Sequence, residues 1–270
     1  MGIIDFQDHL LGRGKADRTI REYVKWVRRL ARWADANGYQ LDTIEPHHVR
    51  RWADDTIPNS RESRKQARTA LAHYYRQRDD RPWEAIRTPR KPRGRPNPLP
   101  DDEAKLLRDG AIMHGGRAGV AVLLLTYTAA RPGEVAAMRW DGIGTDRIVW
   151  WREKVSDWHE APLHPVLCEA LDRFRPPAAE GHLFAGNNGR QHVSATTVWE
   201  WTRRVATTVG LDGVTPRRIR ATAGTRVLAA TGSIDATAAL LGHRDINVTR
   251  AHYAETPWRH LEQAVGSLDW

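Results

Sequence analysis

Apolar residues recur at helical spacing in the first part of the chain. From Asp17 to Gly38 they fall three or four positions apart, at Ile20, Tyr23, Val24, Val27, Leu30, Ala31 and Ala34. This spacing predicts an amphipathic helix, because such residues share one face of a helix with 3.6 residues per turn. Asp17 or Thr19 is the expected N-cap, and Asn37-Gly38 is the expected end.

Two further helices are predicted in the same region. One starts at Glu45-Pro46 and includes Val49 and Trp52. The other starts at Ser60, and its inward positions are Ala67, Leu71, Tyr74 and Tyr75. Its basic residues are expected on the other faces; they are Arg61, Arg64, Lys65, Arg68 and Arg76. Residues 1–86 are therefore predicted to form a small helical bundle with basic faces.

The pattern changes after this bundle. Residues 87–100 hold five prolines and five basic residues, and proline cannot donate to a helix or a sheet, so an extended linker is predicted. A helix begins at Asp101, and residues 119–130 are apolar on nearly all sides, as in a buried helix. Residues 146–164 place β-branched and aromatic runs around a polar turn, which predicts a hairpin. Further helices are expected at 165–174, 195–209, 218–230, 234–241 and 258–265.

The predicted fold is mainly α with one small β-hairpin, an α+β chain with a second domain at residues 101–270. Cys168 is the only cysteine, which excludes an internal disulfide framework. No apolar run approaches the ~20 residues needed to cross a bilayer, and the start of the chain lacks the order of a signal peptide. We expect a soluble cytoplasmic protein with no membrane partner.

The net charge of +9 is unevenly distributed along the chain. Residues 1–100 carry 22 lysines and arginines against 13 acidic residues, whereas residues 101–270 carry 20 of each. A concentrated excess of this kind is typical of a surface that binds nucleic acid phosphates. The candidate DNA-binding residues lie on the third helix and in the linker; they are Arg61, Arg64, Lys65, Arg68, Arg90, Lys91, Arg93 and Arg95. A merely solvated charged face is the alternative.

Residues suited to phosphoryl transfer lie in the second domain. They are Arg131 and Glu134 in "TAARPGEV", Lys154 in the hairpin turn, Arg217 and Arg220 in "TPRRIRAT", and His243 and Tyr253 in "LLGHRDINVTRAHY". Negative charge builds on the phosphate oxygens when a nucleophile attacks, and arginine can bind two such oxygens at once. Arginine cannot release a proton, so a lysine whose pKa can be tuned suits the leaving oxygen. Each motif alone is weak.

In this order, the motifs resemble those of the tyrosine recombinase or phage integrase family. That family has an arginine in a "GxRxxE"-like segment, a hairpin lysine, an "HxxR" box, an "LGH" turn and a C-terminal tyrosine. The resemblance covers nearly the whole chain, and "TIREY" matches the family's core-binding helix near the N-terminus. It implies a core-binding bundle, a catalytic domain, and a short form without an arm-binding domain.

The resemblance also implies roles for individual residues. The catalytic set would be Arg131, Lys154, Arg217, Arg220, His243 and the nucleophile Tyr253, with Glu134 in support. Tyr253 lies ten residues after His243, as in members whose ending resembles "VTRAHY"; His252 holds the ninth position. Arg217 departs from the family, which usually has histidine at the start of "HxxR". Arg217 either binds a phosphate in the active site or turns outward to the DNA.

The implied function is site-specific recombination through a 3′-phosphotyrosyl intermediate on double-stranded DNA, with a homotetramer in the synapse. Such chemistry needs no cofactor and no metal, and none is expected. The apolar tail positions Trp258, Leu261, Val265 and Leu268 would dock on a neighbouring subunit. A type IB topoisomerase and a catalytically silent DNA-binding regulator are the alternatives. Their products differ: strand exchange, relaxation without sequence preference, or binding alone.

Overall fold

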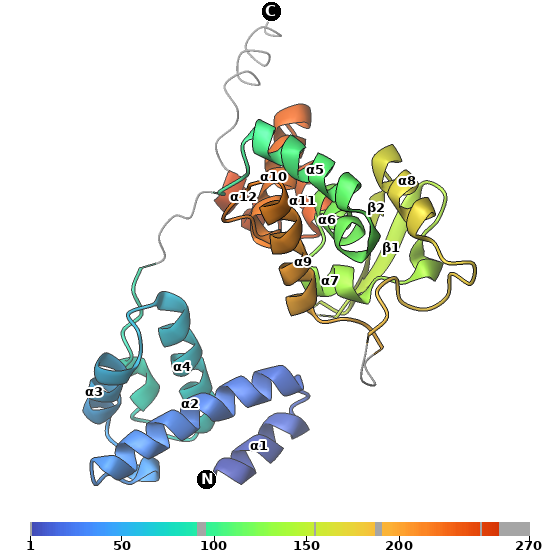
Figure 1. Ribbon diagram of the computed structural model, residues 1–270. Coiled ribbons are helices and arrows are strands. Elements are labelled where there is room, and N and C mark those ends of the chain that lie inside the picture. The colour runs from blue at the N-terminus through green and yellow to red at the C-terminus, as the bar shows by residue number, and fades with distance from the viewer. Residues whose placement is uncertain (1, 91–95, 154, 187–190, 244, 254–270) are drawn as a thin grey trace, which may run out of the picture. The chain divides into compact units, whose positions relative to one another are not determined.

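The computed structural model describes residues 2–90, 96–153, 155–186, 191–243 and 245–253 (Figure 1). Residues 251–253 are described by their backbone alone. The chain divides into two compact units, Met1–Pro92 and Arg93–Trp270. Each unit has a hydrophobic core of its own. None of the described helices is long and apolar enough to span a bilayer.

Unit 1 is a helical bundle. Helix α2 packs on α1 and α4, and the short 3-10 turn η2 packs on α3 and α4. Phe6, Leu30, Trp52 and Leu71 are fully buried at the centre of this bundle. The elements are α1 (Ile3–Gly12), α2 (Asp17–Ala36), η1 (Leu41–Thr43), α3 (Pro46–Thr56), α4 (Arg61–Tyr74) and η2 (Pro82–Ala85).

The three helices predicted for this unit are confirmed, with one correction and one addition. The N-cap of α2 is Ala16, in extended backbone and without a side-chain bond, so the prediction of Asp17 or Thr19 as the cap is wrong. Both residues already lie inside the first turn. Helix α1 was not predicted, and it buries Phe6 and Leu10 completely.

Unit 2 is mainly helical and contains one antiparallel hairpin. Helix α6 runs through its core, with every residue from Ala118 to Leu125 buried, and packs on α5, α8, α9 and α10. The hairpin pairs Arg152 with Asp157, and its first strand packs on α7 (Figure 1). The elements are α5 (Asp101–His114), α6 (Gly116–Thr128), α7 (Pro132–Ala137), η3 (Trp140–Gly142), β1 (Arg147–Arg152), β2 (Asp157–Pro162), α8 (Pro165–Phe174), α9 (Ala195–Thr208), α10 (Pro216–Thr231), α11 (Ile234–Leu241) and α12 (Ile246–Tyr253).

The predicted hairpin and buried helix are confirmed, and the helices predicted at 165–174 and 234–241 have the predicted bounds. The mainly α fold with a small β element is therefore correct. Helix α12 was not predicted, and the helix predicted at 258–265 lies outside the described residues. Residues 87–90 and 96–100 of the predicted linker belong to no helix or strand. Leu99 is buried in the core of unit 2, where its N–H donates to Thr222 Oγ1 at 2.8 Å.

Candidate active site

Arg131 and Glu134 form an ion pair at the start of α7. Arg131 is the N-cap, Pro132 takes the first helical position, and Glu134 follows one turn later. The Glu134 carboxylate accepts the Arg131 backbone N–H at 3.0 Å and its Nη1–H at 2.8 Å. The Glu134 side chain is 10% exposed and the Arg131 side chain 39% exposed. Glu134 therefore orients a guanidinium that stays partly open to solvent.

Glu134 remains ionised at neutral pH. Burial acts to raise the pKa of its carboxyl, but the bonds from the Arg131 backbone and guanidinium, together with the charge of Arg220, lower that pKa overall. The Trp150 Nε1–H also donates to Glu134 Oε2 at 3.4 Å. This largely buried carboxylate is thus held by residues of both α7 and β1.

Arg220 joins three segments of unit 2 that are distant in sequence. It lies in the second turn of α10, which starts where Thr215 caps the backbone N–H of Arg218. Its guanidinium donates to the carbonyls of Ala129 and Leu241, and its Nη2 lies 3.4 Å from His243 Nε2. A side chain held by two backbone carbonyls has little freedom to move. The guanidinium is consequently placed between the α6–α7 turn and the end of α11.

The carbonyl of Ala129 is aimed by an unusual backbone conformation. Ala129 has φ +51° in the left-handed region although it is fully buried, and a residue with a Cβ pays about 1–2 kcal/mol there. The Thr128 hydroxyl supports the turn by accepting the Ala130 N–H at 3.2 Å. This turn leads directly into Arg131, and its Ala129 carbonyl accepts from Arg220. The left-handed backbone at Ala129 therefore helps to position both Arg131 and Arg220.

His243 follows the glycine that ends α11. Gly242 has φ +58° and closes the helix, and the His243 N–H donates to the Ala238 carbonyl at 3.0 Å. The imidazole Nδ1 lies 2.8 Å from the hydroxyl of Thr249, which is fully buried in α12. His243 is therefore tied to α10 through Arg220 and to α12 through Thr249.

The inner face of the hairpin contacts both halves of this site. Trp150 reaches Glu134, as described above, while His159 and Arg152 reach the end of α11. His159 Nε2 lies 3.2 Å from the Leu240 carbonyl, and Arg152 Nη1 donates to the Gly242 carbonyl at 2.6 Å. A carbonyl oxygen can only accept, so His159 donates from Nε2. Burial, the largest influence, lowers the pKa of His159.

The predicted site residues are brought together only in part. Arg131, Glu134, Arg220 and His243 form one connected cluster. Arg217 is exposed in the first turn of α10. Lys154 lies outside the described residues. Tyr253 is the last residue of α12, four positions after Thr249, and its side chain also lies outside the description.

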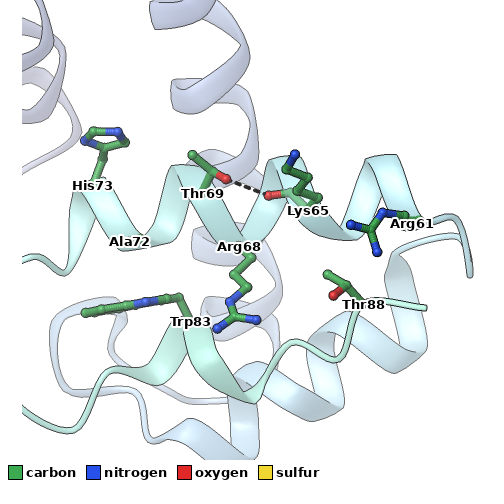
Figure 2. Close-up of a pocket in the computed structure, with 8 residues that line it drawn as sticks. All are labelled: Arg61, Lys65, Arg68, Thr69, Ala72, His73, Trp83 and Thr88. Atoms are coloured by element: carbon green, nitrogen blue, oxygen red, sulfur yellow. Dashed lines mark hydrogen bonds between the residues drawn. The ribbon is translucent and has the colours of Figure 1, made fainter. Parts of the chain in front are cut away.

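A basic groove runs along α4 in unit 1. Figure 2 shows Arg61, Lys65 and Arg68 projecting from this helix, with Trp83 beside Arg68 and Thr88 below Arg61. Arg61 Nη1 donates to the Pro89 carbonyl at 3.0 Å, which holds the beginning of the predicted linker against the helix. The groove is lined by Arg61, Lys65, Arg68, Thr69, Ala72, His73, Trp83 and Thr88. Three cations beside an aromatic ring make it suitable for a polyanion.

Arg64 does not belong to this groove. It was predicted on an exposed basic face, but its side chain is 9% exposed and pairs with Asp54 at 2.9 Å. The guanidinium also donates to the carbonyls of Ala53 and Arg87. Arg64 is thus part of the packing of unit 1. Arg90 is exposed, whereas Lys91, Arg93 and Arg95 lie outside the described residues.

Two family models match the chain in the order that its motifs predict. Residues 99–258 match the phage integrase family, and residues 3–85 match the phage integrase N-terminal SAM-like domain. The chain belongs to the phage integrase family. The resemblance seen in the sequence is therefore confirmed, and the function is that of a site-specific recombinase.

Relatives of this integrase-family chain match it over most of their length. Tyrosine recombinase XerA of Thermococcus kodakarensis is 27% identical over 97% of this chain and 93% of that protein. Tyrosine recombinase XerD of Vibrio vulnificus is 22% identical over 93% of this chain and 89% of that protein. A lambda integrase tetramer bound to a Holliday junction has the same fold, with a TM-score of 0.70 and 20% identity over 90% of this chain and 76% of that one.

Sequence reasoning missed the side chains that brace the site. They are Trp150, Arg152, His159 and Thr249. A signal was present for Arg152, because residues 148, 150 and 152 share one face of a strand and the first two are apolar. A charged residue on the same face as two apolar residues is expected to be buried, and a buried charge needs a polar partner. The partner itself, a backbone carbonyl at Gly242, has no signature in the sequence.

Proposed function

We propose that this recombinase cleaves and rejoins DNA strands through a covalent bond between Tyr253 and a 3′ phosphate. The observation that carries the proposal is the position of Arg220, fixed between the Ala129 and Leu241 carbonyls and next to His243. Ala129 is two residues before Arg131, so the same turn leads to a second guanidinium, which Glu134 orients. Such preorganised positive charge suits a phosphodiester that gains negative charge as it reacts.

The cleavage step divides among these residues as follows. The Tyr253 phenol oxygen attacks phosphorus, and the bond from phosphorus to the 5′ oxygen breaks. Arg131 and Arg220 bind the non-bridging oxygens, and His243 donates a hydrogen bond to one of them. Lys154 gives its proton to the departing 5′ oxygen. A 5′ hydroxyl of another strand then attacks the phosphotyrosine, which reverses the step and joins the strands.

Arg217 is a third guanidinium in this scheme. An arginine stays protonated in proteins, so Arg217 cannot accept the phenol proton as the usual family histidine could. We infer that it binds a phosphate oxygen, and that the phenol proton leaves to water, to the substrate phosphate or to another side chain. Its exposure at the first turn of α10 leaves it accessible to DNA.

Duplex DNA is the proposed substrate, held by the groove on α4. The excess of basic residues in the first hundred positions and the lining of the groove support this role. The matching lambda integrase structure is a tetramer on a Holliday junction. We extend that arrangement to this chain: four copies assemble on two paired sites, and strands exchange between them.

The test is covalent capture of DNA by the purified protein. A duplex is selected from a random-sequence pool by its covalent attachment to the parent protein, and the attached residue is mapped. We expect Tyr253→Phe to retain binding and to lose the adduct, because one oxygen is removed and the ring remains. His252→Ala is the matched control and keeps the adduct. An adduct on Tyr253→Phe would overturn the proposal, as would attachment without sequence preference followed only by relaxation of supercoils.

A further inference from the structure

We propose that Arg152 is a positioning residue for strand cleavage, which ties the hairpin that carries Lys154 to the turn that carries His243. Arg152 is the last residue of β1, and its Nη1 donates to the Gly242 carbonyl at 2.6 Å. Its Nη2 donates to Asp157 Oδ2, on the first residue of β2, at 3.0 Å. One guanidinium thus links both strand ends to the residue before His243. The inference rests on the proposed cleavage chemistry.

The register of the hairpin explains why Arg152 is placed for this task. Pairs of opposed residues alternate between the two faces of the hairpin, so Arg152 with Asp157 and Trp150 with His159 share one face. Trp150 on that face reaches Glu134, and His159 reaches the Leu240 carbonyl. Arg152, in the pair nearest the turn, adds a further contact from the same face, to the Gly242 carbonyl.

The burial of Arg152 indicates that its guanidinium has a role besides stabilising the fold. The Arg152 side chain is 5% exposed, and its Nε is buried without a hydrogen-bond partner among the described residues. An unsatisfied buried donor costs free energy, and well-packed apolar residues often replace buried ion pairs without loss of stability. The neighbouring inward positions of β1, Ile148 and Trp150, are apolar. A charge at Arg152 is better explained by what it positions.

Gly242 is adapted to the same contact. A Cβ at this residue would lie 2.1 Å from Arg152 Nη1 and 3.0 Å from His159 Cε1. The backbone at the end of α11 and the hairpin side chains therefore approach as closely as their atoms allow. In the sequence, Lys154 lies two residues after Arg152, and His243 follows Gly242. The Arg152–Gly242 contact therefore joins residues that are close in sequence to the proposed acid and to the proposed phosphate ligand.

The experiment compares two substrates at saturating protein in single-turnover cleavage. One is the selected duplex, and the other carries sulfur at the 5′ bridging position, so that its thiolate leaves without an acid. We expect Arg152→Met to slow cleavage of the ordinary duplex by about 10- to 100-fold, the scale of a ~1 Å misplacement in an active site. The loss on the sulfur substrate is expected to be several-fold smaller, as for Lys154→Ala.

Two further variants control the comparison. Arg147→Met removes an exposed arginine from the same strand, paired with Asp146 and Glu160 at the other end of the hairpin, and is expected to leave both rates unchanged. Arg152→Lys keeps the charge with fewer donors and gives an intermediate loss. It also provides the measurement if Arg152→Met does not fold, which circular dichroism shows.

The outcomes separate this inference from the proposed function. If the parent protein forms no adduct, the proposed function fails before Arg152 is tested. If the parent cleaves, equal losses on both substrates would show that Arg152 acts on folding or DNA placement, and would overturn the inference. Unchanged rates in Arg152→Met and Arg152→Lys would overturn it as well.

Discussion

Arg217 stands where the resemblance leads us to expect a histidine, so its role is the least predictable from that resemblance. A hydrogen bond to a charged group is worth about 1.5–3 kcal/mol, and Arg217→Ala should slow cleavage by the corresponding factor of about 10 to 150. Arg217→His should retain substantial activity, because imidazole can still donate a hydrogen bond. Single-turnover cleavage at saturating protein measures both variants.

The neighbouring arginine provides the control for this prediction. Arg218 donates to the Gly213 carbonyl at 3.2 Å and lies 3.6 Å from Glu103, so its guanidinium already has partners within unit 2. We expect Arg218→Ala to affect thermal stability more than cleavage. An Arg217→Ala variant as fast as the parent would place Arg217 outside the chemistry.

Individual residues were predictable where local chemistry decides their position. Arg131 and Glu134 are three apart at a helix start, and this spacing alone brings them into contact. Arg64 shows the opposite case. It is three residues before Ala67 and seven before Leu71, hence on the buried stripe of α4, yet its charge suggested an exposed face. Asp54 on α3 makes burial possible, and no pattern within one helix reveals a partner on another.

The contact between the hairpin and the end of α11 depends on Gly242. Gly242→Ala should lower the free energy of unfolding by about 2–4 kcal/mol, from a left-handed backbone and from overlap with Arg152. Calorimetry of the full chain measures this loss. Unit 1 has a separate core, so its transition provides an internal reference.

A double variant distinguishes the two causes. Arg152→Ala removes the guanidinium that a Cβ at Gly242 would meet at 2.1 Å. In that background Gly242→Ala should cost the backbone contribution, about 1–2 kcal/mol, and a small adjustment of His159, whose Cε1 the new Cβ would meet at 3.0 Å. The difference from the cost in the parent is the coupling between Gly242 and Arg152. If Gly242→Ala lowers the free energy of unfolding equally in the parent and in Arg152→Ala, the Arg152 side chain moves aside from the new Cβ at little cost.

The helices that sequence predicted and those it missed differ in where their stability originates. α2 carries an apolar stripe of its own, so periodicity identified it. α12 contains Ile246, Val248 and Thr249, which are weak helix formers; its buried Thr249 contacts His243 instead. α1 is short, and packing of Phe6 and Leu10 against the rest of unit 1 stabilises it. Tertiary contacts decide such helices, and a local pattern does not show them.

The two units differ in charge, and we propose that they divide the work of recombination accordingly. Residues 1–100 contain the whole excess of positive charge, and the α4 groove gathers three cations from it. Residues 101–270 are neutral in sum but hold the connected cluster around Arg220. Each unit has its own core, so a change in the groove should weaken DNA binding and leave the chemistry intact.

Salt dependence of DNA binding tests this division. Each phosphate contact contributes a slope of about −0.9 in log K against log salt concentration, so Lys65→Gln with Arg68→Gln should make the slope shallower by about 1.8. Lys25→Gln with Arg51→Gln removes the same charge from exposed positions outside the groove, where each residue pairs with an acidic neighbour on its own helix. That control should change the slope far less. Cleavage rates at saturating protein should stay at the parent value in both double variants, because neither touches unit 2. If the two double variants lose slope equally, the binding surface is spread over unit 1 and the α4 groove has no special part in it.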